Sequence, residues 1–173
     1  MASSDTPSGI ARIVRISVSP GGVPKQGVPS ARVSSLGVEG DGHRDHRRDG
    51  GPDRALCLFS HERIAALRAE GHPIAPGSIG ENLTIAGIDW AEVTPGTCLL
   101  LGPEVVAQVT DFTSPCANIT ESFRDRDHSR VSQLRHPGHS RVYARVLREG
   151  TITSGDPVRL VAPETARTLV PPR

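Results

Sequence analysis

The sequence predicts a mostly β fold, an antiparallel barrel or sandwich with a few short helices. Six to eight short stretches have the apolar or alternating pattern of strands, and 18 glycines and 15 prolines separate them as turns. Strand and helix patterns do not alternate as they would in a doubly wound sheet. Because 173 residues suit one core, we expect a single domain over 10–162, with a flexible leader at 1–9 and a flexible tail at 163–173.

The first strand is predicted within residues 10–19. Val14, Ile16 and Val18 alternate there with polar side chains. This period of two is typical of a half-buried strand, so we expect these three side chains to face the core. A Pro-Gly-Gly turn ends the strand, and residues 30–41 are expected to form a short strand that leads into a glycine-rich turn.

The run from 42 to 53 is the most charged part of the chain. It has two interpretations, which the sequence leaves open. The first is a solvated surface loop. The second is a loop over a ligand site, with Gly50 and Gly51 allowing close backbone approach and arginine forks meeting anionic groups. The arginines in question are Arg44, Arg47, Arg48 and Arg54.

A buried strand followed by a capped helix is predicted next. The apolar run at 55–59 suits a strand in the core, which makes Cys57 a core residue. Ser60 is placed to cap a helix that ends at Gly71.

Glycine turns at 76–80 lead into a further strand, with Leu83 and Ile85 expected to face inward and Asn82 and Thr84 to lie on the opposite face. The glycine spacing does not match a dinucleotide or phosphate loop.

The second half of the chain contains a predicted hairpin. Strands at 97–101 and 104–110 are joined by Gly102 and Pro103, with Cys98 packed in the first strand. Further on, residues 120–135 are expected to be helical or turn-like, and strands are expected at 142–150 and 157–161 in the sequence.

Cys116 is the cysteine that does not lie inside an apolar run. Ser114 is placed as a helix N-cap and Pro115 as the first helical residue, which would put Cys116 in the first turn. There the helix dipole would favour a thiolate and lower the thiol pKa. A thiolate serves as a nucleophile or as a soft metal ligand, and the local sequence leaves both open beside the alternative of a buried, inert cysteine.

Composition argues against several classes of partner. With 20 basic and 19 acidic side chains there is no global field to attract nucleic acid or an anionic membrane. The three cysteines lack a pairing pattern, and no apolar run approaches the roughly 20 residues that span a bilayer. We therefore expect a cytoplasmic protein that acts on a small molecule, with no nucleic-acid or membrane partner.

Two histidine pairs with i,i+3 spacing, His43/His46 and His136/His139, would allow a zinc site with Cys116. That spacing is common, and exposed loop histidines are the favoured interpretation. A metal-free Cys–His enzyme is a further alternative, with His136 or His139 as base for Cys116, although no nucleophile motif of that class surrounds the cysteine.

An ordered set of motifs resembles the MOSC domain, named for the C-terminal part of molybdenum cofactor sulfurase, over residues 10–161. The motifs, in order, are Gly40-Asp41, Asp49-Gly50-Gly51-Pro52-Asp53-Arg54-Ala55, Pro76-Gly77-Ser78-Ile79-Gly80-Glu81-Asn82-Leu83-Thr84, Ser114-Pro115-Cys116, Tyr143-Ala144-Arg145-Val146 and Gly155-Asp156. Each motif is weak alone, and their order makes the resemblance specific.

The resemblance implies a barrel-like β fold in which Cys116 is the catalytic residue, as a ligand to the molybdenum of a molybdopterin cofactor, or carries sulfur. Some compact relatives reduce N-hydroxylated compounds, and the absence of a flavin or iron–sulfur segment implies a separate electron-donor protein. A non-catalytic sulfur or cofactor carrier is the alternative. The cofactor, which purification could remove, would contact Arg54, Asn82, Thr84, Thr113, Ser114 and Asn118. Asp49 stands where relatives often have histidine, and if this position contacts substrate or cofactor, the specificity or the activity would differ.

Overall fold

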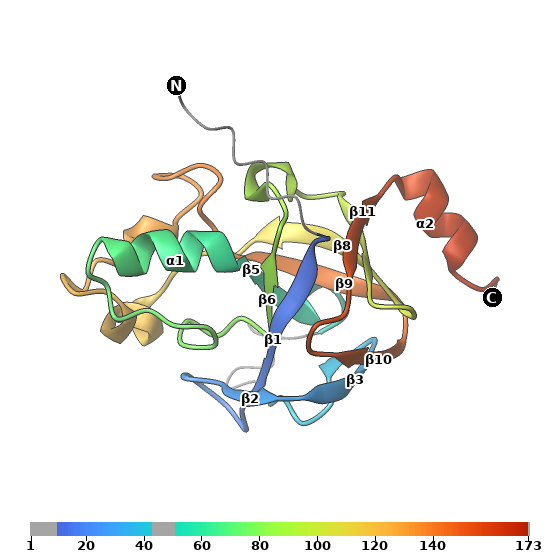
Figure 1. Cartoon of the computed structure of the whole chain (residues 1–173), viewed down its shortest axis with the longest axis horizontal. Helices are drawn as coiled ribbons and strands as arrows, with labels where there is room; N and C mark the ends of the chain where they lie inside the picture. Colours follow the sequence, from blue (N-terminus) through green and yellow to red (C-terminus); the bar gives the residue numbers. More distant parts are fainter. Residues whose placement is uncertain (1–9, 43–50, 173) are drawn as a thin grey trace.

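The computed structural model describes residues 10–42 and 51–172, and within them most of the regular structure is strand (Figure 1). The strands are β1 (Arg12–Val18), β2 (Gln26–Val28), β3 (Ser30–Ser34), β4 (Gly37–Val38), β5 (Leu56–Ser60), β6 (Leu83–Ala86), β7 (Cys98–Leu101), β8 (Val105–Phe112), β9 (Val142–Arg148), β10 (Gly150–Thr153) and β11 (Val158–Val161). The helices are α1 (His61–Ala69) and α2 (Pro163–Leu169), with short 3₁₀ helices η1 (Pro52–Arg54), η2 (Trp90–Glu92), η3 (Ala117–Ser122) and η4 (His128–Val131).

The strands form two sheets. The larger has eight strands in the order β11-β7-β8-β9-β5-β6-β1-β2, and the smaller has the order β10-β3-β4. All named pairs are antiparallel except β5 and β6, so the large sheet is mixed. An isolated bridge joins Arg12 to Pro157, but no ladder within the described residues closes the sheet. The prediction of a mostly β fold is confirmed, whereas the barrel is not.

The β5–α1–β6 unit forms the centre of this arrangement. All five residues of β5 are buried because the strand lies between β9 and β6, and α1 makes the crossover that a parallel pair requires. The Ser60 side chain accepts a hydrogen bond from the Arg63 N–H, and α1 buries Ile64 and Leu67. The predicted strand, helix and cap are therefore confirmed.

A bulge in β1 changes the predicted pattern of inward residues. The register with β6 shifts between Ile13 and Arg15, so Ile13 and Ile16 are the fully buried apolar residues of β1, while Val14 is only half-buried. A bulge inserts one residue and resets which side chains face the core. The expected inward position of Val14 is therefore wrong.

The end of the chain also differs from the prediction. We expected a flexible tail over 163–173, but Pro163–Leu169 form α2. Ala166 of this helix is buried with Cys98 and Val106 in a second apolar cluster. This packing against β7 and β8 orders a segment whose own sequence is too short and too polar to indicate it. The predicted hairpin of β7 and β8, with Cys98 buried, is confirmed.

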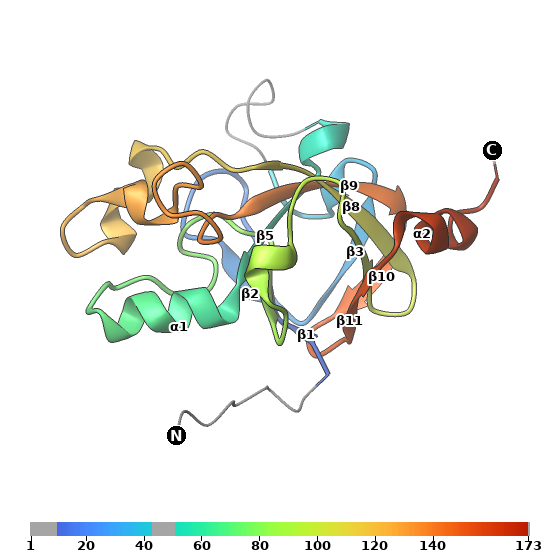
Figure 2. The ribbon, with the colours of Figure 1, turned by 90° about the horizontal axis from the view of Figure 1, so that it is seen from above.

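The long connection from β8 to β9 carries η3 and η4 and lies at the same end of the sheet as α1 (Figures 1 and 2). Arg130 binds Glu70 with Nη2–Oε distances of 2.7 and 2.6 Å, and the Arg124 N–H donates to His72 Nδ1 over 3.1 Å. The connection is thereby held over this end, where the candidate site lies. Among the described residues, no helix combines the length and apolar character needed to cross a membrane.

Candidate functional site

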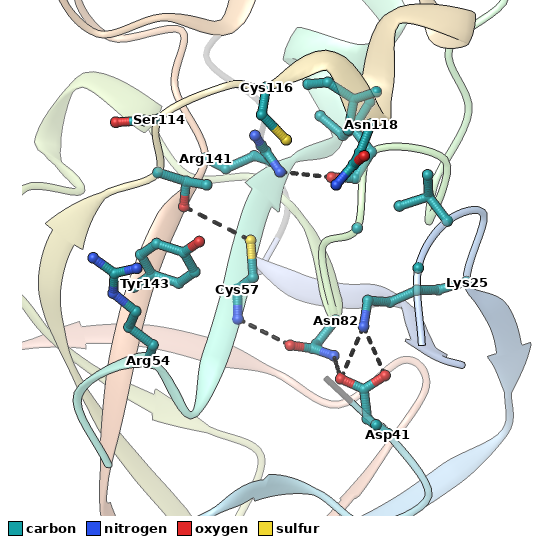
Figure 3. Close-up of a pocket in the computed structure, with 17 residues that line it drawn as sticks. Lys25, Asp41, Arg54, Cys57, Asn82, Ser114, Cys116, Asn118, Arg141 and Tyr143 are labelled. Atoms are coloured by element: carbon teal, nitrogen blue, oxygen red, sulfur yellow. Dashed lines mark hydrogen bonds and ion pairs between the residues drawn. The ribbon is translucent and has the colours of Figure 1, made fainter. Parts of the chain in front are cut away.

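A pocket of about 130 Å³ lies where the segment before η3 and the first turn of η3 meet β5, the loop before β6 and the start of β9 (Figure 3). Its walls come from parts of the chain that are far apart in sequence. They are formed by Gly22, Val23, Lys25, Asp41, Gly42, Arg54, Cys57, Ile79, Gly80, Asn82, Thr113, Ser114, Cys116, Asn118, Ile119, Arg141 and Tyr143.

Six of the seven predicted site residues line this pocket: Arg54, Asn82, Thr113, Ser114, Cys116 and Asn118. Thr84 does not. It lies in β6, an inner strand whose two faces are both covered, so its side chain is fully buried and its Oγ1 has no hydrogen-bond partner in the described part of the chain. The structure therefore places Asn82, which directly precedes β6, at the pocket and Thr84 in the core.

Cys116 is exposed at the pocket, although its local structure is not the predicted one. Cys116 itself has extended φ and ψ and is the N-cap residue of η3, with no side-chain capping bond. Ser114 therefore lies outside the helix, and its hydroxyl points away from Cys116 (Figure 3). Since η3 is a six-residue 3₁₀ helix, the helix-dipole argument does not apply to this thiol, but the inert, buried alternative is wrong too.

Cys57 supplies a second thiol to the pocket. It is 7% exposed, as expected of a core residue, yet its Sγ lies at the pocket wall, 3.9 Å from Thr113 Oγ1. Burial raises the pKa of the Cys57 thiol, which keeps it protonated at neutral pH. Figure 3 shows its sulfur and that of Cys116 on the walls of the same pocket, so the accessible thiol of the site is Cys116.

Arg141 is the buried cation of the site, and sequence reasoning missed it. The residue is 5% exposed, and its Nη1 donates to the Ile79 carbonyl oxygen over 2.6 Å. Its Nε is buried without a hydrogen-bond partner among the described residues. An unpaired buried donor on a charged group is costly, so a ligand that brings an acceptor, above all an anionic one, would satisfy it.

Asp41 and Lys25 form a buried ion pair on another wall. Lys25 Nζ lies 2.7 and 2.9 Å from the two carboxylate oxygens of Asp41. Asp41 also accepts hydrogen bonds from the Ser19 N–H at 2.9 Å and from Asn82 Nδ2 at 2.8 Å. The two charges offset one another, which leaves Arg141 as the buried cation without a paired carboxylate within salt-bridge distance in the described residues.

Asn82 joins the wall at Cys57 to the wall at Asp41 through hydrogen bonds of its side-chain amide. Its Oδ1 accepts the Cys57 N–H over 3.0 Å, while its Nδ2 donates to Asp41 and, at 3.3 Å, to the Ser17 carbonyl. With both ends of the amide engaged and only 3% of the residue exposed, Asn82 orders the pocket wall. Its predicted contact with a cofactor stays a prediction.

The rim of the pocket is formed by Arg54 and Tyr143. The Arg54 guanidinium carbon lies 4.9 Å from the centroid of the Tyr143 ring, a cation–π arrangement. Among the described residues of the charged loop, Arg54 is the arginine that lines the pocket. Arg44, Arg47, Arg48 and Asp49, like His43 and His46, lie outside the described residues.

None of the histidines described by the structure lines the pocket. The His136 and His139 rings are 6.1 Å apart and belong to the connection before β9. No group of three metal-ligating side chains was found in the described residues. The predicted Cys–His pairing at Cys116 is therefore not supported by the geometry.

The residues of the site that sequence reasoning missed differ in how much local signal they carry. Lys25 is the chain's only lysine, and Asp41 and Tyr143 belong to the motifs that carried the family resemblance, so these three could have been added. Arg141 is one of many arginines, and nothing in its neighbourhood distinguishes it. The assembled site offers an accessible thiol, a buried cation and a rigid polar wall, and no general base beside the thiol is found among the described residues.

Comparisons with known proteins identify the family of this chain. The model of the MOSC domain family matches residues 45–159. YflK of Bacillus subtilis, described as an uncharacterized protein, is 32% identical over 125 residues, which cover 72% of this chain and 55% of YflK. YiiM of Escherichia coli is 31% identical over 136 residues, covering 75% and 58% of the two chains. The chain therefore spans little more than half of the length of these relatives.

Two further relatives extend the comparison. A protein of Gibberella moniliformis named "Reductase" is 29% identical over 133 residues, covering 74% of this chain and 23% of the reductase. The crystal structure of YiiM from Geobacillus stearothermophilus superposes with a TM-score of 0.65 at 26% identity, over 87% of this chain and 75% of YiiM. Since the family model matches well over half of the chain, this protein belongs to the MOSC domain family.

Proposed function

We propose that this protein binds the molybdenum cofactor with Cys116 as a ligand to the metal, and that it reduces N-hydroxylated compounds with electrons from a separate donor protein. The observation that carries the proposal is the convergence in one pocket of an accessible thiol, at Cys116, and a buried guanidinium with an unpartnered nitrogen, at Arg141. MOSC domains are associated with this cofactor, and one relative is named a reductase.

The donor set of the pocket fits the group. Molybdenum is a metal for which a soft thiolate is a suitable ligand, and Cys116 presents its sulfur at the pocket. The pterin carries a phosphate, for which Arg141 and Arg54 offer planar guanidinium donors. Asn118 and the backbone at Gly80 lie on the same walls and would contact the polar edges of the pterin.

When bound, the cofactor would supply the two-electron chemistry: R–NHOH + 2e⁻ + 2H⁺ → R–NH₂ + H₂O. The chain's own residues hold and orient the group. The Lys25–Asp41–Asn82 network keeps the wall opposite Cys116 rigid, and Cys57 keeps its proton and so does not compete as a thiolate. The Arg54–Tyr143 pair is placed at the rim, where a substrate would enter.

A carrier of sulfur or cofactor is the second candidate, favoured by the exposure of Cys116, which a partner protein could reach. Purification from a host that makes the cofactor, followed by elemental analysis, tests the shared part of both functions. We expect about one molybdenum per chain in the wild type, its loss in Cys116→Ala, and its retention in the matched control Cys98→Ala, because Cys98 is buried away from the pocket. Wild-type protein without molybdenum would contradict both functions.

An assay for reduction of a hydroxylamino base, with reduced viologen as electron donor, then distinguishes the reductase from the carrier. Turnover that disappears in Cys116→Ala and persists in Cys98→Ala supports the reductase. A loaded protein that does not turn over, but passes molybdenum to a cofactor-free acceptor enzyme, supports the carrier.

A further inference from the structure

Glu81 is a buried carboxyl group beside the pocket that the proposed function does not use. The residue is fully buried. Its Oε1 accepts a hydrogen bond from the Gly77 N–H, which closes the turn from 77 to 81. Its Oε2 has no hydrogen-bond partner in the part of the chain that the structure describes. A glutamate in this state is costly to bury, which raises the question of what it contributes.

The turn that Glu81 closes is bonded to three segments of the pocket wall. The Gly77 carbonyl accepts the Lys25 N–H at 2.9 Å, and the Ile79 carbonyl accepts Arg141 Nη1 at 2.6 Å. Ser78 meets Ser122 at the end of η3, the helix that Cys116 begins, with an Oγ–Oγ distance of 2.9 Å. Glu81 thus fixes the element that positions the buried cation.

The charge of Glu81 changes near neutral pH. Burial raises the pKa of Glu81 to about 7, against the lowering effects of the Gly77 N–H, Arg141 and Arg15. The titratable or charged groups that face this carboxyl are Arg141, Arg15 on β1 and the Cys57 thiol on β5, whose own pKa Glu81 helps to raise. Of these, Arg141 is the cation that the pocket presents to a ligand.

We propose that Glu81 sets the anion affinity of the pocket, and that binding of an anionic group at Arg141 is accompanied by uptake of a proton on Glu81 Oε2. Protonation at Oε2 leaves the hydrogen bond from Gly77 to Oε1 in place, so the turn keeps its shape while the negative charge near Arg141 disappears. This inference rests on the proposed function only in that the pocket takes an anionic ligand.

The sign of the effect follows from linkage. An anion at Arg141 is repelled by ionised Glu81 and not by neutral Glu81, so it binds the protonated protein more tightly. Anion affinity is therefore highest below pH 7 and falls as the pH rises through about 7, the pKa of Glu81. Glu81→Gln keeps an acceptor for Gly77 and has no charge, so it mimics the protonated state at every pH.

Calorimetric titration of the cofactor-free, full-length protein with sulfate tests this, because sulfate keeps its charge across the range. We expect the wild type to bind sulfate roughly fivefold more tightly at pH 6 than at pH 8, because a rise of about one unit in the pKa of Glu81 on binding reaches its full tenfold effect only well above both pKa values. The binding enthalpies measured at pH 7 in two buffers with different ionisation enthalpies give the number of protons taken up. We expect the wild type to take up a fraction of a proton per sulfate bound. Glu81→Gln should bind at pH 8 as tightly as the wild type at pH 6, without proton uptake.

Glu62→Gln is the matched control. Glu62 also accepts a glycine N–H, that of Gly87 at 2.8 Å, but it lies at the surface and does not line the pocket, so this variant should behave as wild type. Arg141→Gln should abolish saturable sulfate binding. The inference is overturned if wild type shows no saturable binding at pH 6, if binding survives in Arg141→Gln, or if Glu81→Gln keeps the wild-type pH dependence.

Should Glu81→Gln not fold, proton uptake by the wild type decides alone, and zero uptake at pH 7 overturns the inference. The proposed function fails on a different measurement, the molybdenum content of the wild type. Proton-linked sulfate binding in a protein that never holds molybdenum would support this inference and reject the cofactor.

Discussion

The two halves of the large sheet bury different chemistry. Around β5, β6 and β1 the buried residues include charged and polar ones: Ser17, Lys25, Glu81, Asn82, Thr84, Thr113 and Arg141. At the other edge, where α2 covers β7 and β8, the buried cluster is Cys98, Val106 and Ala166, packed against partly buried apolar side chains. Buried polar groups cost stability unless they are paired, and four of those named, Lys25, Asn82, Thr113 and Arg141, line the pocket.

The comparison teaches that the pocket half is held by the Lys25–Asp41 pair and the oriented Asn82 amide, whereas the α2 half is held mainly by apolar packing, with one hydrogen bond from Arg148 Nη1 to the Leu169 carbonyl oxygen over 2.7 Å. Changes of charge should therefore lower the stability of the pocket half or alter its pH dependence. Insertion of polar atoms should lower the stability of the α2 half. The following predictions would break or sharpen this contrast, from the largest expected effect to the smallest.

Asp41→Asn should have the largest effect on stability. It leaves Lys25, whose side chain is 9% exposed, without its countercharge, and breaking one partner of a buried pair costs about 3–5 kcal/mol. The free energy of unfolding in urea measures the loss. The control is Glu121→Gln, which breaks the Arg126–Glu121 pair of side chains that are 66% and 83% exposed and should cost under about 1 kcal/mol. Equal effects of the two would show that the pocket half does not depend on its buried pair.

Glu81 should make stability depend on pH. Its pKa rises from 4.5 to about 7 on folding, so the unfolded chain releases this proton first as the pH rises. The stabilising contribution is complete below pH 4.5 and is lost as the pH rises through about 7, a total of ~3 kcal/mol relative to Glu81→Gln. Urea unfolding of both proteins between pH 4 and 8 measures it. Curves that run parallel would contradict the burial of this charge.

In the α2 half, Ala166→Asn should destabilise the protein by ~2 kcal/mol, because it buries an amide with no partner in an apolar cluster. Thr165→Asn, at an exposed neighbouring position, should be nearly neutral. Thermal unfolding compares the two. Since α2 lies away from the pocket, the alkylation rate of Cys116 should stay unchanged, and a change would show that the two halves are coupled.

The alkylation rates of the three cysteines should distinguish the exposed thiol of the pocket from the two buried thiols. Iodoacetamide at pH 8 should modify exposed Cys116 at least roughly tenfold faster than Cys57 or Cys98, both of which are buried with a raised thiol pKa. Peptide mass spectrometry over time gives the three rates. Modification of Cys57 ahead of Cys116 would mean that the pocket opens differently in solution.

Local patterns were enough to predict much of the fold. The β5 strand and α1 with its Ser60 cap depend on neighbouring residues, and they are where the sequence placed them. Other features depend on distant contacts. The β1 bulge arises in pairing with β6, and α2 exists because Cys98 and Val106 offer it an apolar surface. Neither contact is visible in the sequence of the segment itself.

The site follows the same rule. Cys116 was found because polar residues surround it, and Asn82 because it belongs to a recognisable motif. Thr84, two residues further on, was misplaced because only the sheet order shows that β6 is covered on both faces. Arg141 was missed because its position depends on a hydrogen bond to the carbonyl oxygen of Ile79, which is 62 residues away in the sequence.

The most direct test of the central claim is X-ray absorption at the molybdenum edge of the loaded protein. If Cys116 is a ligand to the metal, Cys116→Ser that still retains metal should show one sulfur neighbour fewer than the wild type, and the buried control Cys98→Ser should show the same number as the wild type. An unchanged sulfur count in Cys116→Ser, with molybdenum fully retained, would contradict the role of Cys116 as the anchor of the site.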